Sequence, residues 1–404
     1  MSGNLLRLVL LVSCAHAMVH VYELSLPSVE QEIASEYFGS DEAKGKSYTG
    51  SLSNWWRFLW GIGALLAGWL VDRFGSKPML AIYLLGCCLT CIFASMSHSQ
   101  SQLLFAMILM GASAAIYHPA GLALISHETT AESRPRALGL HGIFGSLGIG
   151  SAPLLAWLLV TSGFSWRDYY WTLAVPGGLL GGVFFLASLR KQDTTKTAPS
   201  VGKLGDDEQD QAQWGSYSLL VVVAASQGFV YSAFLSFLPR YLSGWDITWL
   251  GGTSVQAGKF FAAGILLLGC LGQYVAGRIA RPRLLEIQLA AVIFGNVPFL
   301  AWMAWASGWD RLVAPAMFAV VHFMQQPVYN SLVSKYSPRQ RRSLCYGFSF
   351  AMAFGLGSFG AGFAGSLQSD FAVYGSLSIV AALGGAVAIV LSFQNAGVAT
   401  DFEK

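Results

Sequence analysis

The sequence has few charged residues for its length. Of its 404 residues only 11% are charged and 54% are hydrophobic, and the mean hydropathy is +0.53. Soluble domains carry about 25% charged residues, so this chain cannot cover a water-facing surface of ordinary size. Apolar runs of about 20 residues recur along its length, and each could cross a bilayer core as a helix. These features exclude a soluble globule and predict a polytopic helical membrane protein.

Other absences narrow the function. The formal net charge is only +3, and no basic run is interleaved with aromatic residues, so a nucleic-acid partner is not expected. We find no nucleotide-binding loop, nucleophile elbow or paired-histidine zinc helix, and no sizeable soluble segment, so neither an enzyme nor a cofactor is expected. Cys87, Cys88 and Cys91 cluster without a histidine or carboxylate in their segment, which favours small buried side chains over a metal site.

Twelve apolar segments predict twelve transmembrane helices. They lie near 5–31, 48–71, 78–97, 102–126, 137–161, 169–190, 215–240, 255–278, 285–307, 312–334, 344–367 and 371–393. The polar stretch 191–214 has the composition of a linker. We therefore predict an N-terminal six-helix bundle over 1–190, a C-terminal six-helix bundle over 215–393 and a tail over 394–404.

Basic residues predict the orientation. With the N-terminus in the cytoplasm, 17 of the 24 lysines and arginines fall on the cytoplasmic side and five outside. Positive charge is retained inside, so we expect both termini, the linker and the tail to be cytoplasmic, in the inner membrane of a cell. A monomer suffices for this architecture.

The two halves repeat each other. The segment 118–126, "HPAGLALIS", aligns with 326–334, "QPVYNSLVS", and "LSLP" ending at Pro27 aligns with "SFLP" ending at Pro239. Each pair joins a span to the span six positions later. Two halves related by a parallel repeat are typical of alternating-access transporters, whose substrate site lies between the halves near the membrane midplane.

The loop "GWLVDRFGSKPML" (68–80) resembles the signature loop of the major facilitator superfamily. The matching residues are Gly68, Asp72, Arg73, Gly75 and Lys77, with Ser76 where a basic residue is common. The resemblance implies a cytoplasmic gate, in which Asp72 would face the start of the span near Arg342. The alternative is a plain cytoplasmic turn.

The fifth predicted span is rich in glycine. "HGIFGSLGIGSAPLLA" (141–156) resembles the glycine-rich span of antiporters in the same superfamily, although close helix packing alone would also require small residues. Together with "YHPAGLALIS" (117–126) it is similar to the fosmidomycin-resistance group of proton-coupled drug exporters. This narrower likeness implies export by proton exchange.

Ionisable residues share one face of the first span. His16, His20, Glu23 and Pro27 fall within an arc of about 60° on a helix. Charged groups inside a membrane are costly and mark functional sites, and histidine exchanges protons near neutral pH. We predict that Glu23, His20 and His16 couple transport to protons, the alternative being a structural polar cluster.

Polar residues in other spans predict a substrate cavity. They are Arg57, Tyr117, His118, His141, Gln227, Tyr231, His322, Gln326, Tyr329 and Asn330. Arg57 could bind an anionic substrate, pair with Glu23 or extend to the membrane surface among tryptophans. Lys259 is expected to extend to the surface in the same way.

These features predict a secondary active transporter. We expect proton-coupled efflux of an amphipathic or weakly anionic small molecule, with no resident metal. The alternative is an uptake symporter or facilitator for a polar metabolite, and a membrane enzyme or receptor is the third class.

Overall fold

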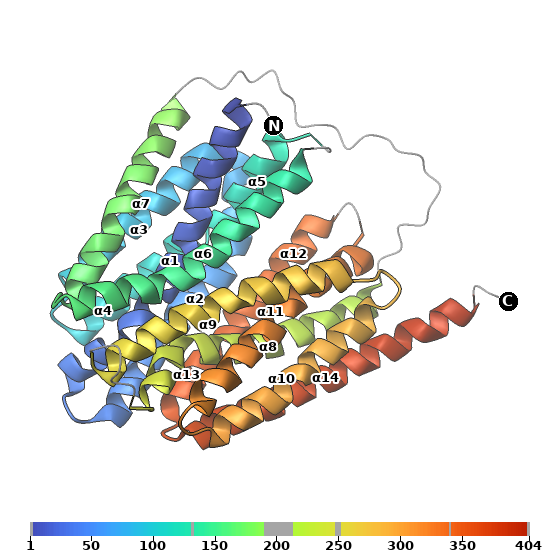
Figure 1. The fold of residues 1–404 in the computed structure, drawn as a ribbon. Coiled ribbons are helices and arrows are strands. Elements are labelled where there is room, and N and C mark those ends of the chain that lie inside the picture. The colour runs from blue at the N-terminus through green and yellow to red at the C-terminus, as the bar shows by residue number, and fades with distance from the viewer. Residues whose placement is uncertain (1–2, 131–132, 190–212, 247–251, 339–340, 402–404) are drawn as a thin grey trace.

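The structure, a computed structural model, describes residues 3–130, 133–189, 213–246, 252–338 and 341–401. In these ranges the chain forms helices joined by short connections (Figure 1). The first half contains α1 (Gly3–Phe38), α2 (Glu42–Phe74), α3 (Ser76–Ser95), α4 (Gln100–Ala114), α5 (Tyr117–Glu128), α6 (Arg134–Thr161) and α7 (Trp166–Leu189). The second contains α8 (Trp214–Ser243), α9 (Ser254–Ile279), α10 (Leu285–Trp305), α11 (Asp310–Tyr336), α12 (Arg342–Phe350), η2 (Ala351–Gly355), η3 (Leu356–Ser358), α13 (Phe359–Ser366) and α14 (Asp370–Asp401).

These elements form the twelve predicted spans, which confirms the fold class. In the described ranges, ten spans are long and apolar enough to cross a membrane. The other two, α2 and α11, are as long but more polar, and they contain Arg57 and His322. The predicted linker 191–214 lies outside the described residues except for its last two, and α14 continues through most of the predicted tail.

Three spans are interrupted or bent along their length. The fourth consists of α4 and α5, which separate just before Pro119, a residue that cannot donate a helical hydrogen bond. The eleventh passes through a π-helical turn, η2, and a 3₁₀ turn, η3, between α12 and α13. The helix α1 contains Pro27 and bends at Val29, whose φ and ψ are −130° and 19°. Such breaks are frequent at functional sites.

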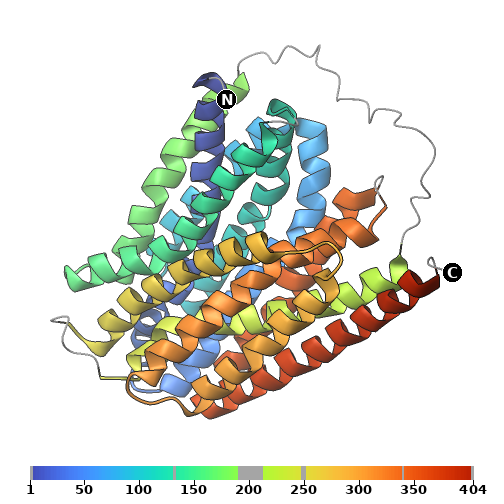
Figure 2. The same ribbon diagram turned by 45° about the vertical axis from the view of Figure 1, so that its right-hand side comes forward.

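The helices form two bundles that meet along part of their length. We call the side where α1 begins and α14 ends the terminus side, and the opposite side the far side. Figures 1 and 2 show that the terminus-side ends of the two bundles point away from each other, whereas the far-side ends lie close together. The chain is therefore arranged as two halves that are closed at one end and separated at the other.

The halves touch closely where α2 crosses the eleventh span, which contains η2 and α13. A Cβ atom on Gly61 would clash with the backbone nitrogen of Gly355, and one on Gly50 would lie 2.9 Å from the Cα of Gly365. Small residues allow helix backbones to approach this closely. Gly68, which is further along α2 on the terminus side, faces open space, because a Cβ there meets no atom within 4 Å.

Replacing Gly61 should therefore separate the halves. We expect Gly61→Ala to lower the free energy of unfolding by about 1–3 kcal/mol through overpacking, measured as a lower melting temperature in detergent. Gly68→Ala on the same helix is the matched control and should leave the melting temperature almost unchanged. Equal effects of the two substitutions would contradict this packing.

Candidate functional site

The polar face of the first span lies inside the molecule. His20 Nδ1 is 2.8 Å from the Oε2 of Glu23, one helical turn away on α1. The Glu23 side chain is fully buried, whereas the His20 side chain is 13% exposed. His20 therefore lies between the buried carboxylate and the molecular surface, where it can pass protons to and from Glu23.

Arg57 on α2 is the cationic partner of Glu23. Its Nη2 is 3.4 Å from the Oε1 of Glu23, and the whole residue is only 1% exposed. Its guanidinium also lies over the ring of Tyr231 on α8, at 5.8 Å from the ring centroid. Of the three alternatives for Arg57, the structure shows pairing with Glu23. Extension to the membrane surface is excluded by its burial.

This pair leaves many hydrogen-bonding groups unused. Glu23 Oε1 and all three guanidinium nitrogens of Arg57 are buried and have no hydrogen-bond partner among the described residues. A guanidinium has five N–H donors and binds carboxylates with two parallel hydrogen bonds. Arg57 therefore retains the capacity to bind an anion.

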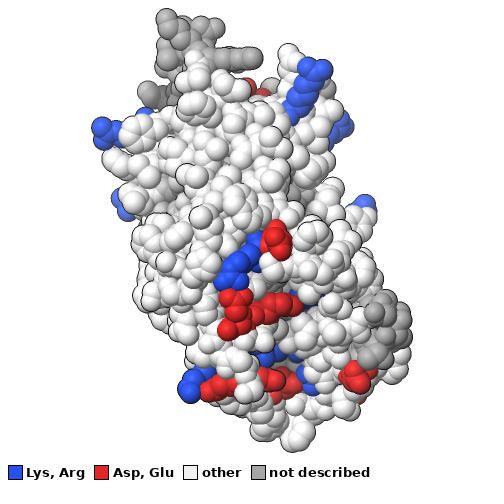
Figure 3. Space-filling view, turned by 90° about the vertical axis from the view of Figure 1, so that its left-hand side faces the viewer, with Lys and Arg blue, Asp and Glu red and all other residues white. Residues whose placement is uncertain are grey.

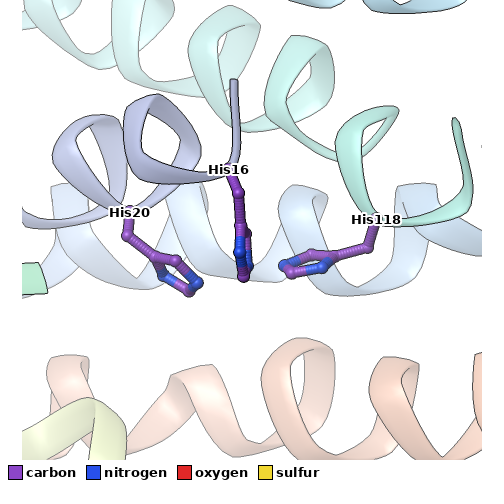
Figure 4. Close-up of side chains that lie close together, drawn as sticks. All are labelled: His16, His20 and His118. Atoms are coloured by element: carbon purple, nitrogen blue, oxygen red, sulfur yellow. The ribbon is translucent and has the colours of Figure 1, made fainter. Parts of the chain in front are cut away.

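Four histidines of the first half gather beside this pair. The His16 and His141 rings are stacked at 4.0 Å, and His16 Nδ1 lies 2.8 Å from the carbonyl oxygen of His141. His118 lies 5.6 Å from His16 and 5.8 Å from His20 between ring centroids, and its buried Nε2 has no hydrogen-bond partner within the described ranges. Figure 4 shows the imidazoles of His16, His20 and His118 pointing from α1 and α5 toward the second half.

The sequence around the histidines explains how they come together. A Cβ atom at Gly145 of α6 would clash with the His16 ring, and one at Gly148 would clash with the backbone of Ala17. The glycines of the fifth span thus bring α6 against α1. Tyr117, which stacks on His16 at 5.3 Å, is held by a 3.0 Å hydrogen bond to the carbonyl oxygen of Val12.

The ring nitrogens of His16, His20 and His118 lie within 4.8 Å of one another. This spacing is short enough for protons to pass between them through a single intervening water. The same three imidazoles are also close enough together to hold a metal ion. His16 and His20 lie on the face of α1 that carries Glu23, and His118 faces them from α5.

The second half contributes an amide and imidazole cluster. Tyr231 is stacked with His322 of α11 at 6.0 Å. Asn296 Nδ2 lies 3.3 Å from the Oε1 of Gln227 and 3.4 Å from the Nδ1 of His322. Asn296 is fully buried on α10 and its Oδ1 has no partner among the described residues. Tyr231 connects this cluster to Arg57, so polar groups of both halves form one continuous site.

Other predicted residues of α11 lie at the edge of this cluster or outside it. Gln326 is exposed and accepts a 3.0 Å hydrogen bond from Gln273 of α9. Asn330 is exposed, and Tyr329 is partly buried. Gln325, the neighbour of Gln326 in the sequence, lies 3.0 Å from His322 Nε2.

The predicted cytoplasmic gate is not engaged in this structure. Asp72 and Arg73 are exposed, and the Arg73 guanidinium lies over the rings of Trp69 and Phe74. In the described ranges no ion pair or hydrogen bond joins Asp72 to the second half. Gly75 has a φ of 86°, which glycine adopts without steric cost, and begins the turn into α3. Gly68 and Lys77 are partly buried beside it.

The expectation for Lys259 was wrong. Its side chain is 1% exposed and its Nζ lies 2.9 Å from the Oε1 of Glu32 on α1. Sequence reasoning also missed Asn296 and the ion pair between Glu30 and Arg240. A signal for that pair was present, because an acid follows Pro27 and a base follows Pro239, the equivalent proline of the repeat.

The comparison with known families agrees with this architecture. A family model described as Major Facilitator Superfamily matches residues 21–362. The chain belongs to this superfamily. The inward open xylose transporter of Escherichia coli has a TM-score of 0.74 at 15% identity, over 96% of this chain and 95% of that chain. A bacterial homologue of the human lysosomal transporter Spinster, inward-facing and unoccupied, has a TM-score of 0.67 at 15% identity, over 97% and 96%.

Two curated relatives belong to transport systems. A probable L-galactonate transporter of Escherichia coli is 26% identical over 268 residues, 62% of this chain and 59% of that protein. A triacylglyceride transporter of Mycolicibacterium smegmatis is 25% identical over 200 residues, 49% and 33%. The matches span less than two thirds of the length of either relative. As a superfamily member, the protein is a multi-pass membrane protein.

The buried pair gives a test of the site. Removing one charge of a buried ion pair leaves the other unpaired and costs about 3–5 kcal/mol, whereas removing both costs much less. We expect Glu23→Gln and Arg57→Gln each to lower the melting temperature, and the double variant to recover much of the loss. Arg73→Gln, at an exposed position of the same helix, is the control. Additive losses in the double variant would show that the two side chains do not interact.

Proposed function

We propose that this protein carries a small organic anion across the membrane together with a proton. Arg57 binds the carboxylate of the substrate, and Glu23, with His20 and His16, carries the proton. The observation that supports this assignment is the buried guanidinium of Arg57, whose one charged partner in the site is the Glu23 carboxylate at 3.4 Å.

Competition for Arg57 supplies the coupling. A substrate carboxylate that binds Arg57 displaces Glu23, which then lacks a cation in a poorly hydrated interior. A buried carboxylate without a counter-charge is stable only when it is protonated. His20, in contact with both Glu23 and the surface, delivers that proton. The anion and the proton therefore enter the site together, and they leave together when Glu23 returns to Arg57.

The second half suggests the rest of the substrate. Gln227, Asn296, His322 and Gln325 offer amide and imidazole groups to hydroxyls, and Tyr231 places them next to Arg57. A substrate with a carboxylate for Arg57 and several hydroxyls for this cluster would be a sugar acid. The name of the L-galactonate relative favours the same class. This version corresponds to the symport alternative of the sequence analysis.

Export by proton exchange is the second candidate. It is favoured by the glycine-rich span 141–156, which is similar to that of antiporters, although its glycines also serve to pack α6 against α1. In an exporter the substrate and the proton would move in opposite directions. We place the protein in the inner membrane as a monomer with cytoplasmic termini in either case.

Transport in proteoliposomes tests the proposal. With a panel of sugar acids, neutral sugars and amphipathic cations, we expect sugar acids to accumulate when the opposite compartment is the more acidic. Glu23→Gln should abolish this pH-driven accumulation but keep exchange of substrate for substrate, because Arg57 still binds the anion. Arg57→Gln should raise KM about tenfold or more, since a charge-assisted hydrogen bond contributes about 1.5–3 kcal/mol.

The same assay separates the two candidates. Accumulation in the acidic compartment would indicate exchange rather than co-transport, and transport of cations alone would exclude Arg57 as the anchor. Lys44→Gln, at an exposed position of α2 outside the site, should transport like the wild type. Unchanged pH-driven accumulation in Glu23→Gln would remove Glu23 from the proton pathway.

A further inference from the structure

The far-side end of α1 binds the second half through charged side chains. The helix bends at Val29, two residues after Pro27. The next three residues, Glu30, Gln31 and Glu32, are all polar, and each contacts a residue of α8 or α9. The bend thus directs a short polar segment onto the opposite half.

The Glu30 contact is a two-pronged ion pair. Arg240 Nε donates to Glu30 Oε1 at 2.6 Å, and Arg240 Nη2 donates to Glu30 Oε2 at 3.0 Å. Glu30 is 2% exposed and also accepts a hydrogen bond from Thr49 of α2. Charge-assisted hydrogen bonds of this kind are about twice as strong as those between neutral groups, and the two parallel bonds also fix the geometry.

The neighbouring residues add further contacts between the halves. Gln31 Nε2 donates to Ser243 Oγ at 3.0 Å. Lys259 Nζ lies 2.9 Å from Glu32 Oε1, with the lysine almost fully buried. Lys46 of α2 donates to the carbonyl oxygen of Leu367, beyond α13, at 2.7 Å. Figure 3 shows acidic and basic side chains side by side on the lower part of the face it presents, which is the far side.

These contacts cannot persist when the far side opens. Glu30 and Glu32 are held by α1, whereas Arg240 and Lys259 belong to the second half, so separating the halves leaves four charges to be hydrated or paired again. The cost of burying them is offset only while the halves touch. The ion pairs therefore favour the arrangement seen here, closed on the far side and separated on the terminus side.

We propose that residues 30–32 form the far-side gate of the transporter, with the bend at 27–29 as its hinge. Opening of the far side breaks Glu30–Arg240 and Glu32–Lys259 together, because both acids lie on one short segment. The same helix carries His16, His20 and Glu23, so movement of the gate is transmitted along α1 to the site. The inference requires alternating access alone, not the identity of the substrate or of the coupling ion.

Hydrogen–deuterium exchange of the purified chain in nanodiscs tests the gate without a substrate. In Glu30→Gln/Glu32→Gln, we expect exchange to become about fivefold faster or more at the far-side ends of α8 and α9. Exchange at the terminus-side ends of α6 and α12 should slow in the same sample, because the equilibrium moves toward the opposite opening. This change in opposite directions distinguishes a shift between states from general loosening.

Glu36→Gln is the matched control. Glu36 lies on the same segment of α1 and pairs with Arg167 at 2.6 Å, but Arg167 belongs to the same half. This variant should not combine faster exchange on the far side with slower exchange on the terminus side. The charge swap Glu30→Arg/Arg240→Glu should return the far-side exchange toward the wild-type rate.

Three results would overturn the proposal. They are no change in the double variant, faster exchange on both sides, or the same two-sided shift in Glu36→Gln. If the double variant does not fold, Glu30→Gln and Lys259→Gln are judged singly by the same criterion. This experiment measures no transport, so its result does not depend on the proposed co-transport. A negative result here would likewise leave the role of Arg57 untouched, because the transport assay tests that role separately.

Discussion

The structure depends on keeping one ion pair, Glu23–Arg57, in an interior with little water. Neither charge could remain there alone, since the cost of an unpaired buried charge exceeds the contribution of most packing contacts. Their partnership is also incomplete, with a 3.4 Å separation and several donors unused. Two charges that must be paired, but whose hydrogen-bonding groups are partly unused, are suited to exchanging one partner for another. This property makes the site a candidate for coupling rather than a structural cluster.

The helix α1 links this site to the closure of the molecule. Its terminus-side part holds the histidines, its middle holds Glu23, and beyond the bend at Val29 it holds the acids that bind Arg240 and Lys259. Glycines at the α1–α6 and α2–η2 crossings allow the backbones to approach closely at the same level. A small change in the position of α1 therefore moves the histidines, the Glu23–Arg57 pair and the contact between the halves at once.

Much of this could be predicted from the sequence. Hydropathy and the repeat lead to twelve spans in two halves, and the spacing of His16, His20 and Glu23 places them on one face. What could not be predicted required distances between helices. The partner of Arg57 depends on whether α2 brings it to Glu23. The partner of Lys259 depends on whether α1 bends toward α9. Asn296 is a lone polar residue in an apolar span, and only the packing of α10 against α8 and α11 shows its partners.

The central claim is that anion binding to Arg57 obliges Glu23 to take up a proton. Calorimetry of anion binding in buffers of different ionisation enthalpy measures it directly, because the heat then varies with the number of protons exchanged. The account predicts uptake of about one proton for each anion bound, and no uptake in Glu23→Gln. Release of protons on binding, or binding with no proton exchanged in the wild type, would contradict it.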